Sequence, residues 1–239
     1  VQELANEYLT EQGITILNDV TLNSVSNDGN KPVITANGQN YTFDAVLYAT
    51  GRKPNTANIG LENTDITTNE RGAIVVNDTC ESSVPGVYAV GDVNGGPQFT
   101  YISLDDFRIV FGALTGNGQY TLKDRKNIPY TTFLTPPLAR VGLTEEDAIN
   151  KGYTVKTKEM LVATMPRAHV NDYLKGAFKI VVNAENNLIL GATLYSQGAE
   201  ELINLIKMAM DNNIPYTYFK NQIFTHPTMV ENLNDLCNF

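Results

Sequence analysis

The segment from Gly86 to Val93, with the residues that follow it, constrains the fold most strongly. Four apolar residues in a row, 87–90, predict a short strand buried on both faces, and Gly91 and Asp92 end it at a sharp turn. After a loop rich in glycine, apolar side chains recur at helical spacing, at Leu104, Phe107, Phe111 and Leu114. A strand, a glycine turn, a carboxylate and a helix in this order predict the ligand-binding edge of an open α/β sheet.

Length and charge exclude several classes of protein. The chain has 239 residues, enough for one large domain or two smaller ones, and it opens on Val1 rather than Met, which suggests a piece of a longer protein. A net charge of −9 argues against a nucleic-acid partner. No apolar run approaches the roughly 18–20 residues that span a bilayer, so no membrane partner is expected. Cys80 and Cys237 are too far apart in sequence for a redox motif, which favours a reducing, cytoplasmic setting.

The first half of the chain opens on a helix and continues in strands. Residues 2–12 carry apolar side chains on one side and precede Gly13, which predicts a helix with a glycine cap. Strands are expected at residues 14–17, 21–25, 32–36, 43–49 and 73–76. This order is typical of the last third of a βαβ nucleotide-binding domain. The glycine-rich GxGxxG turn of a complete domain is missing, and residues 116–118 do not fit it.

The second half has a different pattern. A polar stretch at residues 116–127 is expected to link the two halves. Beyond it, strands are predicted at residues 130–134, 138–143, 153–162, 177–182 and 188–195. A capping box at 144–147 opens a short helix, and two further helices follow, at about 197–211 and up to residue 236. Strands that precede helices predict an antiparallel α+β domain, distinct from the α/β half before it.

Asp92 is the first candidate for chemistry. A carboxylate beyond the end of a strand can accept hydrogen bonds from sugar or polyol hydroxyls, and the helix N-terminus near Thr100 and Tyr101 offers N–H groups and a positive dipole to a polarised oxygen. Alternatively, Asp92 only caps its own turn. The segment Thr50-Gly51-Arg52 is a second candidate, because Gly51 permits close backbone approach, although strands commonly end in glycine.

His226 is the third candidate, since it precedes a helix whose first turn contains Glu231, within reach of the ring. A carboxylate partner favours the imidazolium and suits a general base or the partner of a thiolate. Alternatively, Thr228 and Glu231 form a capping box, and Glu231 only satisfies backbone N–H groups. His169, the other histidine, has no evident partner and is expected to be a surface or satisfied residue.

Four motifs in this order resemble the flavoprotein disulfide reductase family, which includes glutathione reductase, lipoamide dehydrogenase and mercuric reductase. They are ATGR at residues 49–52 with Asn55, GVYAVGD at 86–92, LTPPLARVGLTEE at 134–146, and HPT at 226–228 with Glu231. The resemblance covers the whole chain, which corresponds only to the C-terminal portion of the family's sequences. Residues 98–106 and 225–235 look most like the branch linked to resistance to reactive chlorine and hypothiocyanous acid.

The resemblance implies a division of the chain. Residues 1–48 would end the NAD(P)H-binding domain, residues 49–121 would complete the FAD-binding domain, and residues 127–239 would be the dimerisation domain. The implied fold class is an α/β remnant of the NAD(P)- and FAD-binding domains followed by an α+β antiparallel-sheet dimerisation domain. The redox cysteine pair and both dinucleotide-binding glycine turns lie upstream in this family, so the resemblance implies a truncated chain.

The resemblance also implies roles for individual residues. Asp92 would bind the ribityl chain of the flavin, and the helix that begins at Thr100 and Tyr101 would face the isoalloxazine edge. The residues placed at the cofactor are Gly51, Arg52, Gly91, Asp92, Phe99, Thr100 and Tyr101. His226, held by Glu231 and followed by a cis peptide bond to Pro227, would reach across the dimer to the partner's cysteines as the catalytic acid and base.

The function expected from the resemblance is that of an FAD-dependent NAD(P)H oxidoreductase. Hydride would pass from NAD(P)H to FAD, and electrons then to a cysteine pair and an acceptor. The partners expected are a second copy of the chain and the upstream half of the same protein. Two alternatives stay open: a non-catalytic homodimerisation module, and a fragment of a sister flavoenzyme such as an NADH oxidase.

Overall fold

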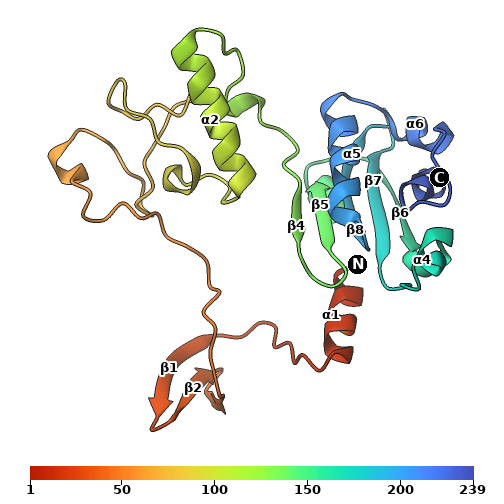
Figure 1. Ribbon diagram of the computed structural model, residues 1–239, viewed down its shortest axis with the longest axis horizontal. Helices are drawn as coiled ribbons and strands as arrows, with labels where there is room; N and C mark the ends of the chain where they lie inside the picture. Colours follow the sequence, from red (N-terminus) through yellow and green to blue (C-terminus); the bar gives the residue numbers. More distant parts are fainter. The chain divides into compact units, whose positions relative to one another are not determined.

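A five-stranded antiparallel sheet forms the centre of the second half of the chain (Figure 1). The computed structural model describes all residues, 1–239. The strands lie in the order β4-β5-β8-β7-β6, and every neighbouring pair is antiparallel. Their bounds are β4 (Tyr130–Thr132), β5 (Leu138–Gly142), β6 (Val155–Leu161), β7 (Ala177–Asn183) and β8 (Ile189–Tyr195). The predicted antiparallel α+β domain is therefore confirmed.

Helices cover one face of this sheet and bury its core. Helix α5 (Ala199–Asp211) packs on β5 and β8, and α7 (Leu233–Leu236) on β6 and β7. The pairing places Leu194 opposite both Ala139 and Phe178, so these three side chains point to one face, where they are fully buried. The remaining helices of this half are α3 (Glu145–Asn150), α4 (Pro166–Val170) and α6 (Tyr216–Asn221), with 3-10 turns η4 (Val162–Thr164) and η5 (Val230–Asn232).

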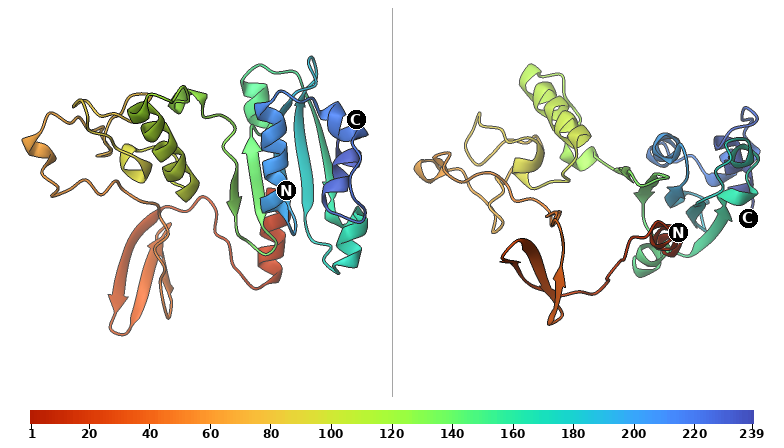
Figure 2. Two further views of the ribbon diagram at one scale, coloured as in Figure 1. Left: turned by 45° about the horizontal axis from the view of Figure 1, so that its top comes forward. Right: turned by 60° about the horizontal axis from the view of Figure 1, so that its bottom comes forward.

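The N-terminal helix α1 (Gln2–Glu11) belongs to the same compact unit as the C-terminal sheet. This unit comprises residues 1–17 and 126–239. The Tyr8 hydroxyl accepts a hydrogen bond from the Gly176 N–H at 3.3 Å, and the Lys175 ammonium lies 2.6 Å from the Glu11 carboxylate. Val1 and Gln2 line the sheet face opposite α5, and Figure 2 shows α1 and α5 on opposite sides of the sheet. The assignment of residues 1–48 to one domain stays a prediction.

Residues 18–125 form the second compact unit. It contains an antiparallel sheet in the order β1-β2-β3 and one long helix, α2. Their bounds are β1 (Leu22–Asp28), β2 (Lys31–Ala36), β3 (Gln39–Thr42) and α2 (Thr100–Thr115), with 3-10 turns η1 (Leu61–Asn63), η2 (Gly91–Asn94) and η3 (Leu122–Asp124). The helix from Thr100 and the strands near 21–25 and 32–36 were expected from the sequence, and the structure contains them.

Four predicted strands are wrong, at residues 14–17, 43–49, 73–76 and 87–90. The last two form only isolated bridges, Thr68 with Ile74 and Glu81 with Tyr88. Val87 and Val90 are each about two-fifths exposed, so this segment is not buried on both faces. A buried strand needs neighbouring strands to satisfy its backbone groups, and no strand of this chain lies beside these segments.

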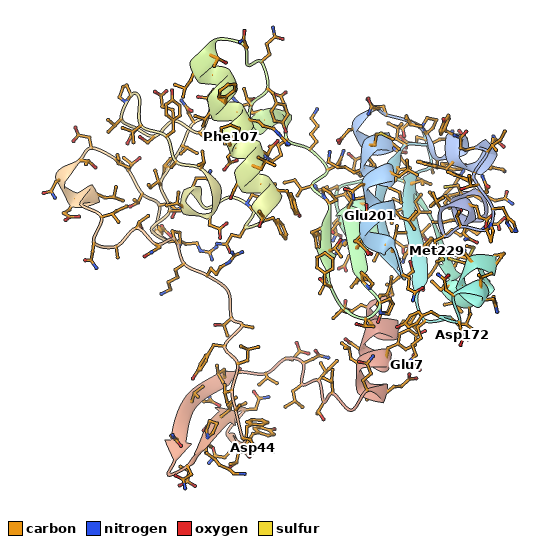
Figure 3. The ribbon with its side chains drawn as sticks, viewed as in Figure 1. Glu7, Asp44, Phe107, Asp172, Glu201 and Met229 are labelled. Carbon is orange, nitrogen blue, oxygen red and sulfur yellow. The ribbon has the colours of Figure 1, made fainter.

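The apolar stripe that predicted α2 is also exposed rather than buried. Phe107, labelled in Figure 3, is 54% exposed, and Leu104, Phe111 and Leu114 are exposed too. The face that α2 buries contains Ile102, Asp106 and Ile109 instead. No helix of the structure is both long and apolar enough to cross a membrane.

Candidate functional site

An ion pair joins the two motifs predicted at the ligand edge. The Arg52 Nη1 atom lies 2.7 Å from Asp92 Oδ2, and Arg52 Nη2 donates a hydrogen bond of 2.7 Å to the Gln98 carbonyl. Asp92 lies in the 3-10 turn η2, and its carboxylate is 40% exposed. The carboxylate therefore has a cation on one oxygen and remains open to solvent.

Gly91 allows the turn that carries Asp92 to approach α2 closely. Its φ is +73°, in the left-handed region, and a Cβ atom there would lie 2.5 Å from the Ser103 hydroxyl oxygen. Any larger residue would push η2 and α2 apart. Gly51 also has a positive φ, of +99°, but a Cβ there would meet nothing within 4 Å, so only its backbone conformation requires glycine.

The start of α2 lies beside this turn, since α2 packs on η2. The helix begins at Thr100 after Phe99, and no side chain caps it with a hydrogen bond. The rings of Phe99 and Tyr101 stack with centroids 5.0 Å apart. An open carboxylate, a helix N-terminus and a stacked aromatic pair fit a cofactor that combines hydroxyl groups with a flat ring. The geometry thus brings together Arg52, Gly91, Asp92 and the start of α2.

His226 and Glu231 form the other predicted site, which lies in the unit with the five-stranded sheet. The His226 Nδ1 atom lies 2.8 Å from Glu231 Oε2, and the peptide bond to Pro227 is cis. Because the carboxylate can only accept, Nδ1 is the donor in this bond, and Nε2 is left for another partner. The imidazole is 69% exposed, so Nε2 is open to a reacting group.

Glu231 performs both roles that the sequence offered as alternatives. Its Oε1 accepts the Thr228 N–H at 2.9 Å, and its own N–H donates to the Thr228 hydroxyl at 3.3 Å, which is a reciprocal capping box. The backbone hydrogen bond from Thr228, followed by the bond to His226, lowers the pKa of Glu231 below its ordinary value. The carboxylate is therefore ionised at neutral pH and orients the imidazole.

The other titratable candidates carry no reactive site. Burial raises the pKa of Cys80 to about 11 and that of Cys237 to about 12, so both thiols are protonated at neutral pH. His169 is bound through its ring Nε2 to the Ala163 carbonyl at 2.8 Å, the satisfied residue that the sequence predicts. No group of three or more histidine, cysteine or acidic side chains is arranged to hold a metal ion.

An open pocket of about 650 Å³ lies on the sheet face opposite α5, and none of the residues predicted to bind the cofactor or to take part in catalysis lines it. Its cations are paired, Lys179 with Glu145 at 2.7 Å and Arg140 with Asp147 at 3.5 Å. The Lys179 ammonium lowers the pKa of Glu145. Both cations already have a counter-ion, so this pocket is expected to bind a charged ligand less well than the Asp92 site.

A buried acid that none of the sequence motifs indicates lies beneath the Asp92 turn. Asp106 is fully buried on α2, and its Oδ2 accepts the Gly91 N–H at 2.7 Å. Its other oxygen pairs with Arg125. The signal was present in the sequence, because Ile102, Asp106 and Ile109 share one helical face. A carboxylate between two isoleucines on one face indicates a buried, paired acid.

Comparison with known proteins gives consistent matches along the chain. Residues 1–106 match the family model described as pyridine nucleotide-disulphide oxidoreductase, and residues 128–237 match the model of the dimerisation domain of the same enzymes. A curated relative, the probable pyridine nucleotide-disulfide oxidoreductase RclA of Escherichia coli, is 44% identical over 95% of this chain and 52% of its own length. The mercuric reductase of Staphylococcus aureus is 35% identical over 98% of the chain and 43% of its own length.

A solved structure has the same fold. The HOCl-induced flavoprotein disulfide reductase RclA from Escherichia coli superposes with a TM-score of 0.93 and 42% identity, over 98% of this chain and 54% of its own. LpdA from Mycobacterium tuberculosis superposes with a TM-score of 0.88 at 22% identity, over 98% of this chain and 51% of its own. The chain thus spans about half the length of the proteins it matches.

Proposed function

The chain belongs to the pyridine nucleotide-disulphide oxidoreductase family, and on that premise we propose that it is the C-terminal part of an FAD- and NAD(P)H-dependent disulfide reductase. The observation that carries the proposal is the ion-paired Asp92 turn beside the start of α2, in a chain that spans 52% of the length of a relative 44% identical to it. The flavin, when bound, accepts hydride from the nicotinamide and passes electrons to a cysteine pair.

In this proposal Asp92 binds the ribityl hydroxyls. Its carboxylate is open to solvent on one side, while the ion pair with Arg52 at 2.7 Å fixes its orientation. The N-terminus of α2, at Thr100, directs its positive dipole toward the flavin edge. Phe99 and Tyr101 provide a flat apolar surface for the ring.

The upstream half of the same protein completes this site. The exposed stripe on α2, formed by Leu104, Phe107, Phe111 and Leu114, is a continuous apolar surface on a chain whose relatives are about twice as long. Burial of each such side chain contributes about 1.5–3 kcal/mol, so the packing of another segment on this stripe would be strongly favoured. We assign this surface to the upstream half, which would also supply the pyrophosphate-binding glycine turn.

His226 transfers protons in the same proposal. Nδ1 is held by Glu231, so Nε2 accepts a proton from a thiol of the partner subunit and returns it. A general acid or base must be accessible to the reacting group, and the ring of His226 is exposed. The dimerisation domain, residues 128–237, supports a homodimer in which each His226 serves the other subunit. Both cysteines of the chain are free and buried, which suits the expected cytoplasmic setting.

The test uses the longer protein with a His226→Ala variant and a His169→Ala control. His169 is the other histidine, and its ring is bound to a backbone carbonyl rather than to a carboxylate. Turnover from reduced flavin to the cysteine pair is expected to fall by about 100-fold or more in His226→Ala, because general acid–base catalysis contributes at least that much, and to stay unchanged in the control. Undiminished turnover in His226→Ala would remove the proposed role.

A second candidate function is a homodimerisation module without catalysis, which the completeness of the sheet domain favours. Its twenty-residue buried core lies within one unit. Size-exclusion chromatography with light scattering on the 239-residue chain tests it. A dimer without bound flavin supports self-association through residues 127–239, and a monomer contradicts it.

A further inference from the structure

A buried ion-pair network lies beneath the turn that carries Asp92. Asp106 is at its centre, fully buried among the apolar side chains of α2. One carboxylate oxygen of Asp106 accepts hydrogen bonds from the Gly91 N–H at 2.7 Å and from the Asn94 side-chain amide at 2.9 Å. These two residues are the first and last of η2, so one oxygen holds both ends of the turn.

The opposite oxygen of Asp106 pairs with the Arg125 guanidinium, which also donates from Nε to Asp105 at 2.7 Å. Arg125 itself is only 10% exposed, and Asp105 accepts a further hydrogen bond from the Tyr120 hydroxyl at 3.3 Å. A buried carboxylate without a cation would tend to take up a proton, because desolvation disfavours its charged form. Arg125 therefore offsets the cost of burying the Asp106 carboxylate, whose opposite oxygen accepts the two hydrogen bonds of η2.

The charge on Asp106 matters for the turn. Hydrogen bonds to an ionised acceptor are shorter and roughly twice as strong as neutral ones. A neutral asparagine in the same place would present an N–H group toward Arg125 or toward Gly91, where two donors would then face each other. Gly91 is the residue directly before Asp92 and packs on Ser103, so a small shift of its amide would move the Asp92 carboxylate.

We propose that Asp106, held by Arg125, is a positioning residue that sets the conformation of η2 and through it the orientation of Asp92. The expected effect on FAD binding rests on the proposed function, whereas the effect of Asp106 on the conformation of η2 does not. Asp106 does not touch the cofactor in this account. It acts through the Gly91 amide.

Asp105 provides a matched control. It precedes Asp106 on the same helix and pairs with the same Arg125, but it makes no hydrogen bond to η2. Asp105→Asn and Asp106→Asn each remove one carboxylate from Arg125 without changing side-chain size. A role in burying Arg125 alone predicts similar effects of the two variants, whereas a positioning role predicts a difference at the turn.

The first experiment measures the Gly91 backbone amide by NMR in the 239-residue chain. A charge-assisted hydrogen bond shifts the amide proton downfield and protects it from exchange. In Asp106→Asn, we expect the Gly91 signal to move upfield and its exchange to accelerate by at least tenfold, with less than threefold acceleration in Asp105→Asn. Equal effects in the two variants, or an unchanged Gly91 signal in Asp106→Asn, would overturn the proposal.

A second pair of variants applies if Asp106→Asn does not fold. Arg125→Gln leaves Asp106 in place but removes its cation. Lys123→Gln, two residues before Arg125, removes a surface cation that pairs with Asp78 instead. Gly91 exchange is expected to accelerate at least threefold in Arg125→Gln and not in Lys123→Gln. Unchanged exchange in Arg125→Gln contradicts the proposal.

The consequence for the cofactor is measured in the longer protein. The FAD dissociation constant is expected to rise about tenfold in Asp106→Asn and to change less than twofold in Asp105→Asn. If the wild-type longer protein binds no flavin, the proposed function fails, and the Gly91 measurement still decides whether Asp106 positions the turn. If flavin binds equally well to all three proteins, Asp106 does not act on Asp92.

Discussion

The two compact units of the chain bury their apolar side chains to different extents. In the unit with the five-stranded sheet, six of the seven residues of β7 are buried, and three of them belong to a core of twenty buried residues. In residues 18–125, α2 buries only Ile102, Asp106 and Ile109 while its larger apolar side chains face solvent. The two units therefore differ in how much of their apolar surface they bury, and the proposal above assigns the exposed stripe on α2 to the upstream half.

The largest expected contrast is between two phenylalanines. Phe178 on β7 is fully buried, and Phe107 on α2 is 54% exposed. Phe178→Ala is expected to lower the free energy of unfolding of its unit by about 3–5 kcal/mol, because it leaves a cavity, whereas Phe107→Ala costs less than about 0.5 kcal/mol in this chain. Hydrogen exchange resolved by residue measures each unit separately. Equal losses of unfolding free energy in the two variants would contradict the difference in burial between the two phenylalanines.

Glycine substitutions sharpen the same contrast. Gly176 has a φ of +126°, and a Cβ atom there would overlap the carbonyl oxygen of Tyr195. Gly86, in the other unit, has a φ of +79° with nothing within 4 Å of an added Cβ. Gly176→Ala is expected to destabilise its unit by about 3 kcal/mol or more, from steric overlap added to backbone strain, and Gly86→Ala by about 1 kcal/mol, from strain alone. Denaturant titrations of the two variants check this, and a larger effect at Gly86 would contradict it.

The Arg52–Asp92 pair is expected to affect stability little. Both side chains are substantially exposed, at 59% and 40%, and such surface pairs contribute about 0–1 kcal/mol. Arg52→Ala should therefore leave the unfolding of the 239-residue chain nearly unchanged while weakening flavin binding by the longer protein. The control is Lys31→Ala, which breaks an exposed pair with Asp44 at 2.8 Å. Loss of flavin binding in the control as well would show that the effect is not local.

The smallest expected effect is a change in titration. The pKa of Glu231 lies below its ordinary value, first because of the Thr228 N–H and second because of His226. The stability it contributes is present above the ordinary glutamate pKa of about 4.3 and is lost as pH falls through the lowered value. His226→Gln should raise the pKa of Glu231 only part of the way, because the Thr228 hydrogen bond persists. A ¹³C titration of the carboxyl group measures it, and no rise at all would contradict the pairing.

The sequence predicted the antiparallel domain well because its five strands pair with one another. Its strands β7 and β8 are neighbours in the chain and in the sheet, so local turns such as Asn186-Asn187 already specify the pairing. The strands predicted at residues 43–49 and 87–90 are wrong because these residues belong to neither sheet of the structure. An apolar run predicts that its side chains are buried, but it does not identify the segment that covers them.

At the candidate site, the sequence proposed residues and, of their contacts, only those that Glu231 makes with His226 and Thr228. Arg52, Asp92, His226 and Glu231 were predicted from motifs, while the ion pair between Arg52 and Asp92 depends on a turn that only the fold brings together. Asp106 was missed because the exposed stripe at Leu104 and Phe107 has the stronger apolar periodicity. An exposed apolar stripe resembles a core face in sequence, so the face that α2 buries could be identified only from the position of Asp106 between Ile102 and Ile109.

Flavin absorbance of the longer protein, before and after addition of NADH or NADPH, tests the central claim most directly. The account predicts bound flavin that is bleached by a nicotinamide cofactor, together with no stable flavin binding by the 239-residue chain alone, because that chain supplies only one wall of the site. A longer protein that is folded and dimeric but carries no flavin, and takes none up when FAD is added, would contradict the account.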